Sequence, residues 1–152
     1  MKIEEEIQQT HFKSEHQKVH INILFTAAWL SQQVTQALKA YHISWQQFNI
    51  LRILKGQHPE AVTVKLLRER MIDKMSNASR LVEKLRQKDL VVRKECPNDR
   101  RRVDIVLTAK GLELIEVSSA AIEEHLQEQL QNVSIEEAKI LNDLLDKMRD
   151  RA

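Results

Sequence analysis

The sequence has few of the residues that tight turns, disulfides and nucleotide-binding loops require. Its 152 residues include 2 glycines, 2 prolines and 1 cysteine, and aromatic residues make up 4%. So few turn-forming residues argue against a β-sandwich or β-barrel and exclude a glycine-rich phosphate-binding loop. A single cysteine cannot form an internal disulfide, which fits a reducing compartment. The scarcity of aromatic side chains argues against an extended platform for stacking bases.

A long hydrophobic run is also missing. The longest nearly apolar stretch extends from Ile23 to Leu30, whereas a membrane-spanning helix needs roughly 20 apolar residues. The N-terminal segment is acidic and has no apolar core of a signal peptide. We therefore expect a cytoplasmic protein with no membrane partner. The chain is 42% apolar and 30% charged, as globular proteins are, and its length favours a single domain over residues 1–152.

Charge is unevenly distributed along the chain. The net charge is +2, from 24 basic and 22 acidic residues. Residues 65–102 contain thirteen of the basic and six of the acidic residues, a local charge of +7 that leaves −5 for the remainder. A basic middle between acidic ends favours a polyanionic partner such as nucleic acid. A lysine-rich solvated helix surface is the alternative that charge alone leaves open.

Hydrophobic periodicity predicts a mainly helical protein. Apolar residues at three- and four-residue steps predict one long amphipathic helix over residues 7–40. Capping boxes at Ser44–Gln47 and Ser134–Glu137 mark the starts of two further helices. Together with caps at Thr63 and Thr108, the pattern predicts later helices over residues 44–56, 63–70, 74–88, 108–131 and 134 to the C-terminus.

Between residues 90 and 108 the pattern changes from helical to β. Residues 91–95 are β-prone, residues 96–99 have the composition of a turn, and apolar residues alternate over 103–107. This predicts a two-stranded hairpin, so the fold class is mainly α with a small β-hairpin. A helix-turn-helix followed by a β-hairpin is a winged helix.

The helix predicted over residues 74–88 has the pattern of a recognition helix. Its apolar stripe consists of Ala78, Leu81, Val82 and Leu85. The opposite face carries Ser76, Arg80, Glu83 and Gln87, with Asn77 and Lys84 beside it. A helix that enters the major groove needs short polar side chains at one end, and there Arg80 can bind guanine and Asn77 can bind adenine. An ordinary amphipathic helix with a solvated polar face is the alternative interpretation.

The predicted hairpin turn is followed by a run of arginines. Arg100, Arg101 and Arg102 come directly after Asp99. Arginine on a narrow ribbon fits the negative potential of the minor groove. Asp99 is expected to pair with one of these arginines and orient it. A charged edge that discourages strand aggregation is the alternative. Three consecutive arginines exceed what that purpose requires.

These motifs resemble the MarR family of bacterial transcription regulators. The resemblance is carried by residues 79–85, 89–91 and 99–111, where Asp-Arg-Arg is followed by Leu-Thr and by a glycine three residues beyond the threonine. It extends through residues 44–54 and the order of helices, and so covers most of the chain. One departure is Asp89, which stands where the family has a glycine before the first strand.

The resemblance implies a homodimer in which the helices of residues 1–40 and 109–152 interlock, while residues 44–108 form a winged helix-turn-helix. It implies a sequence-specific transcription regulator, a repressor released by a small molecule or another signal, on pseudo-palindromic double-stranded DNA. The DNA-binding residues it implies are Ser76, Asn77, Ser79, Arg80, Lys84, Arg100, Arg101 and Arg102. Charge alone adds Lys65, Arg86 and Lys94 as phosphate contacts.

Other functions have weaker support from the sequence. There is no nucleotide loop, CxxC motif or nucleophile elbow, so we expect neither an enzyme nor a cofactor. The alternative function is that of a winged-helix dimer acting as a protein-interaction module. The basic residues on the predicted recognition helix and wing argue against it.

Three features remain open as sensors of a signal. His16 and His20 have the i, i+4 spacing of a metal pair, but the sequence supplies no further ligands, so we predict no metal site. Cys96 lies in a basic segment, where thiols can become reactive, although an incidental turn cysteine is the simpler interpretation. Trp29, Trp45 and Phe48 lie where members of the family bind aromatic ligands, and we interpret them as core.

Overall fold

The computed structural model describes residues 1–96 and 99–150, and the side chains of residues 95–102 are outside the described part. The described residues form seven α-helices, one 3-10 helix and three strands. In chain order these are α1 (Ile3–Glu6), α2 (Glu15–Leu38), η1 (Lys39–Tyr41), α3 (Trp45–Lys55), β1 (Val62–Thr63), α4 (Val64–Arg70), α5 (Ala78–Gln87), β2 (Val91–Cys96), β3 (Asp99–Leu107), α6 (Ala109–Gln129) and α7 (Ile135–Arg149).

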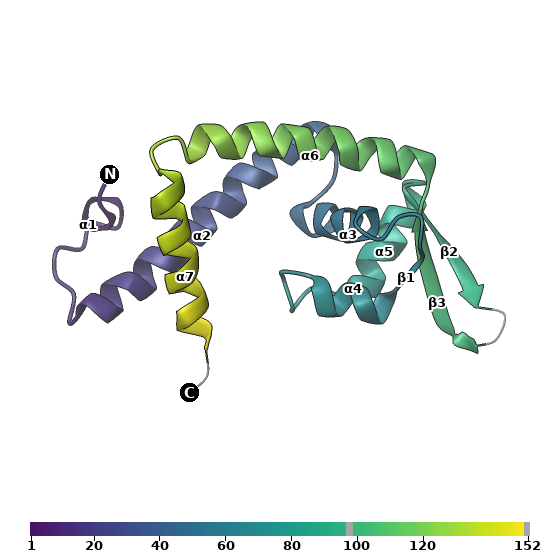
Figure 1. Ribbon diagram of the computed structural model, residues 1–152, viewed down its shortest axis with the longest axis horizontal. Helices are drawn as coiled ribbons and strands as arrows, with labels where there is room; N and C mark the ends of the chain where they lie inside the picture. The colour runs from purple at the N-terminus through teal and green to yellow at the C-terminus, as the bar shows by residue number, and fades with distance from the viewer. Residues whose placement is uncertain (97–98, 151–152) are drawn as a thin grey trace.

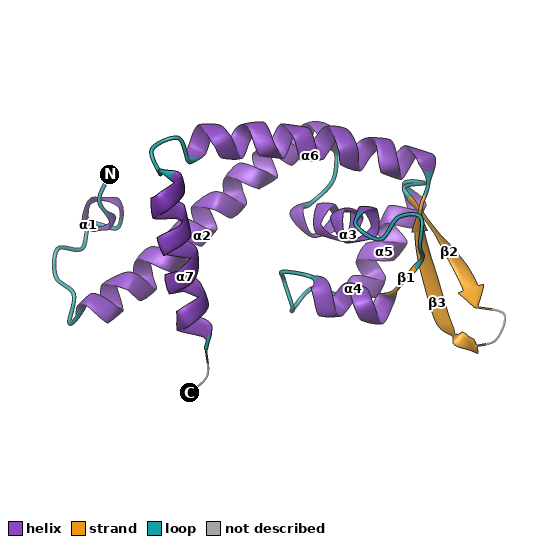
Figure 2. Cartoon of the chain, viewed as in Figure 1, coloured by secondary structure: helices purple, strands orange, loops and turns teal. Residues whose placement is uncertain are grey.

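Two groups of elements lie under the long helix α6 (Figure 1). Helices α3, α4 and α5 and the sheet gather beneath its first half, and β2 and β3 project away from them (Figure 2). At its other end, α7 turns downward and overlaps α2 in this view, and α1 lies near the outer end of α2, where Glu4 pairs with Lys18. We call the first group the winged helix and the second group, together with α6, the helical arm. Among the described residues, no helix is both long enough and apolar enough to cross a membrane.

Polar caps begin most of the helices where the sequence predicts them. The Ser44 hydroxyl accepts from the Gln47 backbone N–H at 3.2 Å, and the Gln47 side chain accepts from the Ser44 N–H at 3.0 Å. Ser134 and Glu137 form the same reciprocal pair at the start of α7. Thr63 caps α4 and Thr108 caps α6. Each such cap is worth about 1 kcal/mol, so local chemistry alone sets these boundaries.

The prediction of one helix over residues 7–40 is wrong at its N-terminal end. The chain instead forms the short helix α1, a non-helical segment, and then α2. Gln8 has a φ of 53°, which ends any helix there, and the Ser14 hydroxyl caps the new helix by accepting from Gln17 N–H. The break lets α1 fold back on α2, with Ile3 6% exposed and Glu4 paired with Lys18 at 2.5 Å.

The predicted start of the recognition helix at residue 74 is also wrong. Helix α5 begins at Ala78, with Asn77 as its N-cap. The preceding residues form a turn instead, in which the Asp73 carboxylate accepts from the Met75 N–H at 3.0 Å and from the Ser76 hydroxyl at 2.6 Å. Aspartate competes in this way with helical hydrogen bonding. The helix-turn-helix therefore has a longer turn than the periodicity predicts.

The hairpin gains a third strand that the sequence does not predict. The sheet has the order β1-β3-β2, and all of its pairs are antiparallel. Val62 pairs with Ile105, and Val91 pairs with Leu107, with an irregularity between Glu95 and Cys96. Strand β1 has only two residues, which is too short to produce an alternating pattern. Pairing with β1 fastens the base of the wing to the segment that precedes α4.

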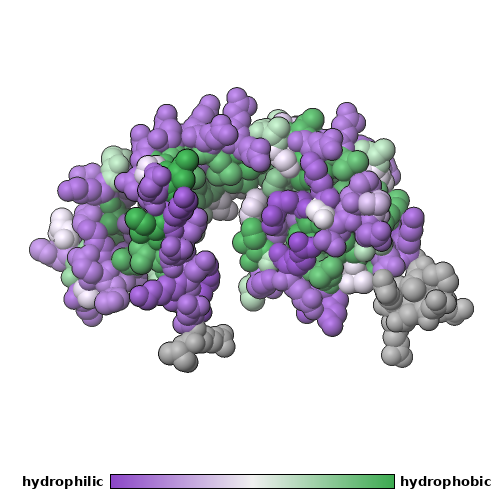
Figure 3. Space-filling view, in the orientation of Figure 1, coloured by the Kyte–Doolittle hydropathy of each residue, from purple (hydrophilic) through white to green (hydrophobic). Residues whose placement is uncertain are grey.

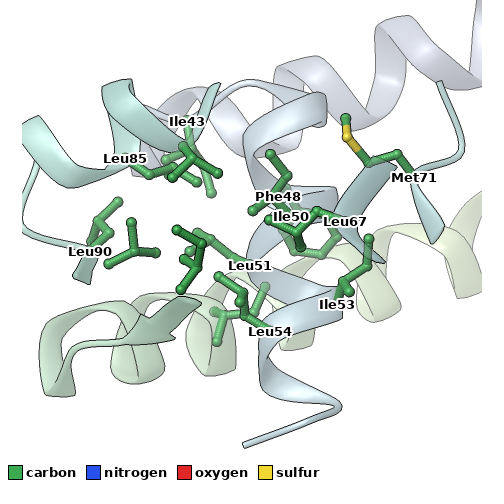
Figure 4. Packing of buried hydrophobic residues seen from close by; sticks show 14 of the residues in the cluster. Ile43, Phe48, Ile50, Leu51, Ile53, Leu54, Leu67, Met71, Leu85 and Leu90 are labelled. Atoms are coloured by element: carbon green, nitrogen blue, oxygen red, sulfur yellow. The ribbon is translucent and has the colours of Figure 1, made fainter. Parts of the chain in front are cut away.

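One apolar core fills the winged helix and reaches α6 (Figure 4). The Phe48 ring is 3% exposed and stacks on the Trp45 ring with centroids 5.8 Å apart, so both belong to this core as predicted. Trp29 is different, because 39% of it is exposed. Fully buried side chains, among them Leu51 and Leu85, hold the helices together, and truncating such a leucine to alanine costs about 2–5 kcal/mol.

Candidate nucleic-acid interface

Helix α5 packs one face into the core and leaves the other outside. Ala78, Val82 and Leu85 are buried, as the sequence predicts, and the fourth residue of the predicted stripe, Leu81, is half-buried. The predicted DNA-binding residues of the helix itself are all exposed, namely Ser79, Arg80 and Lys84. Burial of the apolar stripe therefore fixes which side chains of α5 can meet a partner.

Two further predicted base contacts make local hydrogen bonds at the start of α5. The Asn77 side-chain oxygen accepts from the Arg80 backbone N–H at 3.0 Å, which caps the helix. Half-buried Ser76 donates its hydroxyl to Asp73. Asn77 is exposed, and its contact with a base stays a prediction. Hydrogen bonds from Ser76, the Met75 N–H and Gln46 lower the pKa of Asp73.

A carboxylate connects α5 to the wing. Glu83 accepts two hydrogen bonds from the Arg86 guanidinium, at 2.8 and 3.0 Å, and lies 3.7 Å from the Arg93 guanidinium on β2. The hydrogen bonds from Arg86 are the main reason that the pKa of Glu83 is lowered. The sequence places Glu83 on the outward face of the helix but does not indicate its long-range partner. Arg86, predicted as a phosphate contact, is therefore already paired with a carboxylate.

Strand β3 of the wing carries the predicted arginines. Strand β3 begins at Asp99 and includes Arg100, Arg101 and Arg102, although their side chains lie outside the described residues. Their contact with DNA therefore stays a prediction. On the neighbouring strand Lys94 is exposed.

A basic cleft lies beside the helix-turn-helix. Its volume is about 520 Å³, and it is lined by Lys65, Arg68, Glu69 and Lys74. The Lys74 ammonium donates to the Glu69 carbonyl oxygen at 2.5 Å. The sequence predicts Lys65 as a phosphate contact, and in the structure Arg68 and Lys74 line the same cleft. Lys74 lies in the turn after α4, and the Lys65 ammonium lies 4.0 Å from the Glu69 carboxylate in the same cleft.

A second cleft, which we call the α6 pocket, lies where the helical arm joins the winged helix. It has a volume of about 520 Å³ and is lined by Tyr41, His42, Ile43, Lys88, Leu90, Lys110, Glu113, Leu114 and Val117. The Lys88 ammonium donates to the His42 carbonyl oxygen at 2.5 Å, and the Lys110 ammonium donates to the Lys88 carbonyl oxygen at 2.9 Å. Its lining thus combines apolar side chains with two lysines.

The candidate sensor residues occupy separate places in the structure. His16 and His20 both lie on α2. Within residues 1–96 and 99–150, no group of three or more His, Cys, Asp and Glu side chains is arranged to hold a metal ion. Cys96 ends strand β2, and its side chain is among those that the structure does not describe.

Comparison with known proteins gives one family match. Residues 43–103 match the model of the MarR family. A curated relative, the uncharacterized HTH-type transcriptional regulator YdgJ of Bacillus subtilis, is 32% identical over 108 residues, which are 71% of this chain and 65% of the relative. The chain therefore matches slightly less than two thirds of that relative's length.

Solved structures share the fold. A crystal structure from Bacillus cereus, described as MarR-like, superposes with a TM-score of 0.79 at 27% identity and covers 89% of this chain and 96% of that one. Mutant MarR from E. coli in complex with operator DNA superposes with a TM-score of 0.78 at 21% identity, over 93% of this chain and 100% of that one. The second likeness concerns the fold alone.

Proposed function

Residues 43–103 match the model of the MarR family, and from this premise we propose that the protein is a sequence-specific regulator of transcription that binds double-stranded DNA. The observation that carries the proposal is the outward face of α5. There Ser79, Arg80 and Lys84 are exposed on a helix whose apolar stripe is buried. This arrangement suits a helix that enters the major groove and reads the edges of bases.

The rest of the winged helix supports the same function. The basic cleft of Lys65, Arg68 and Lys74 suits the phosphate backbone beside the groove that α5 enters. The β2–β3 hairpin projects from the winged helix (Figure 2). Its arginine-rich strand, β3, suits the minor groove. Binding that rests on phosphate contacts weakens steeply with salt. We propose that the protein is a regulator and not an enzyme. Because it would act on chromosomal DNA, it would work in the cytoplasm.

We further propose that the helical arm forms a homodimer. The arm exposes large apolar side chains on α2, α6, α7 and the connection between α6 and α7, including Leu24, Leu130, Val133, Ile135, Ile140, Leu141, Leu144 and Met148. Figure 3 shows this apolar surface beside α7 and a hollow between α7 and the winged helix. Exposed apolar surface of this extent suits a protein partner. A two-fold dimer would match a pseudo-palindromic DNA site.

The proposed effector site is the α6 pocket. It joins the segment after α2, the end of α5 and the first turns of α6, so a ligand in it would contact both the arm and the winged helix. Its apolar lining with Lys88 and Lys110 suits a small amphipathic anion. Such a ligand would compete for the hydrogen bond between Lys88 and His42 at the end of the recognition helix. Release of a repressor from its operator by this route is the regulation that we propose.

The proposal is tested by selecting genomic DNA fragments with the purified protein and titrating the selected duplex by fluorescence anisotropy. We expect a pseudo-palindrome bound by a dimer. Arg80→Ala should relax the base preference, with a loss of about 1–3 kcal/mol for the preferred duplex. Lys139→Ala is the matched control, because it removes one exposed charge from α7. Weak binding without sequence preference would instead favour the alternative, a winged-helix dimer that binds a protein.

A further inference from the structure

A side chain from α3 holds the turn that precedes the recognition helix. Asn49 lies on α3 and is 1% exposed. Its side-chain oxygen accepts from the backbone N–H of Ile72 at 2.9 Å, across 23 positions of the sequence. Met71, the residue before Ile72, is 1% exposed and ends α4. The bond therefore joins α3 to the point where the chain leaves α4.

The rest of the turn continues this connection to the first residue of α5. Asp73 follows Ile72 and accepts from the Met75 N–H and the Ser76 hydroxyl. Gln46, one helical turn before Asn49 on α3, also bonds to Asp73 and contributes to its lowered pKa. Asn77 then caps α5. Polar groups of α3 therefore hold the start of the turn at Ile72 and Asp73, and the turn leads to the cap of the recognition helix.

Packing alone does not account for an asparagine at position 49. A buried amide loses its hydration and must recover it through hydrogen bonds. The Asn49 amide nitrogen is buried and has no hydrogen-bond partner among the described residues. A leucine of similar size would avoid this cost, so the bond from Ile72 is the one favourable polar contact that the structure assigns to this side chain.

The same part of α3 also lies against the other end of α5. Lys88, the C-cap of α5, donates to the His42 carbonyl oxygen at 2.5 Å and to the Gln47 side-chain oxygen at 3.5 Å. Gln47 belongs to the capping box that begins α3. The start of α3 therefore contacts the turn that precedes α5 through Asn49, and it contacts the C-cap of α5 through Gln47 and Lys88.

We propose that Asn49 is a positioning residue for DNA recognition. By fixing Ile72 it sets the path of the turn and so the direction in which α5 presents Ser79 and Arg80. The inference rests on the proposed function and adds a determinant of specificity that touches no DNA. Loss of the bond would leave the cations of α4, Lys65 and Arg68, in place while the base-reading face shifts. Discrimination between sequences should therefore fall more than general affinity for DNA.

The test compares Asn49→Leu with Asn49→Asp in the full-length protein. The first variant removes the acceptor at similar volume, and the second keeps an oxygen that can accept from Ile72. Each is titrated with the selected duplex and with a scrambled duplex of the same composition. For Asn49→Leu we expect the ratio of the two affinities to fall about tenfold, the scale of one lost hydrogen bond. Asn49→Asp should restore the ratio, which a loss of general packing would not allow.

Amide hydrogen exchange at Ile72 keeps the test decisive if a variant folds poorly. The Ile72 amide should be protected in the wild type and lose that protection in Asn49→Leu. If Asn49→Leu does not fold, Asn49→Ser replaces it, because its shorter side chain cannot reach the same atom. If Asn49→Leu loses protection at the Ile72 amide but keeps the wild-type ratio of the two affinities, the inference is wrong and the proposed function stands. A wild-type protein with no preferred duplex overturns the proposed function as well.

Discussion

Gly111 lies directly against the carbonyl oxygen of Leu90. A Cβ atom at position 111 would come within 2.0 Å of that oxygen, a distance that no side chain can occupy. Leu90 immediately precedes β2, and its carbonyl oxygen also accepts from the Thr108 N–H at 3.1 Å. The first turn of α6 is therefore packed on the chain that leads into the wing. This contact gives a physical reason for the glycine three residues after the threonine in the wing motif.

We expect Gly111→Ala to lower the free energy of unfolding by about 1–3 kcal/mol, the usual cost of forced overpacking. The clash is with backbone, so no side-chain rotation relieves it. Urea denaturation measures the change. Gly56→Ala is the control, since a Cβ there would meet its nearest atoms at 3.6 Å and the substitution should be neutral or stabilising. Equal stability of wild type and Gly111→Ala would contradict the close approach.

Asp89, which stands where the family has a glycine, has a left-handed backbone conformation. Its φ is 59°, in the left-handed region that aspartate tolerates better than most residues. Glycine adopts this region without strain and would fit the same backbone. We expect Asp89→Gly to raise the free energy of unfolding by up to about 1 kcal/mol and Asp89→Ala to lower it. Thermal unfolding of the two variants gives the order, and a more stable alanine variant would refute it.

Asp73 should make stability depend on pH. Because its hydrogen bonds lower its pKa in the folded state, its contribution is complete above the ordinary aspartate pKa of about 3.9 and is lost as the pH falls through the lowered value. Ser76→Ala removes the main cause of the shift. We expect a shallower loss of stability on acidification for this variant in urea titrations at decreasing pH. Ser79→Ala is the control, because Ser79 is exposed on α5 and should leave the slope unchanged.

Glu83 should limit non-specific binding to DNA. It pairs with Arg86 and Arg93, and its charge repels phosphate. Glu83→Gln frees both guanidinium groups, so affinity for a scrambled duplex should rise. The plot of log affinity against log salt should steepen by about one unit for each additional phosphate contact. Anisotropy at several salt concentrations measures the slope. Glu116→Gln on α6 serves as control, and an identical slope in the two variants would count against the idea.

The exposed face of α7 should be needed for dimerisation. Leu141 and Leu144 are 52% and 54% exposed, and burial of this remaining surface between two chains contributes about 1 kcal/mol each. The double variant Leu141→Glu and Leu144→Glu should sediment as a monomer at concentrations where the wild type is a dimer. Asn142→Glu adds a charge at an exposed position of the same helix and should leave the dimer intact. A dimeric double variant would place the interface elsewhere.

Much of the fold follows from local rules, and so does the likeness to the MarR family. The capping boxes at Ser44 and Ser134, the caps at Thr63 and Thr108 and the apolar stripe of α5 involve residues three or four positions apart. Such neighbours meet whenever a helix forms. Sequence patterns therefore predict them without knowledge of the rest of the chain.

The same local patterns fail where a competing contact changes the path of the backbone. Periodicity continues through residues 7–14 and 74–77, yet the Ser14 cap and the Asp73 turn exclude these residues from the helices. Apolar spacing shows which face a helix would bury, but it does not show where a polar side chain ends the helix. Strand β1 escapes prediction for a related reason, since its partner on β3 is more than 35 residues away.

By itself, the sequence determined the class of the protein: the helical composition, the basic middle segment, the outward residues of α5 and the wing motif. Only tertiary structure decided how those residues are held. It showed that Glu83 reaches Arg93, that Lys88 reaches His42 and that Asn49 reaches Ile72. These contacts join segments whose spacing in the sequence follows no period, and they form only after burial of the apolar faces has brought the helices together.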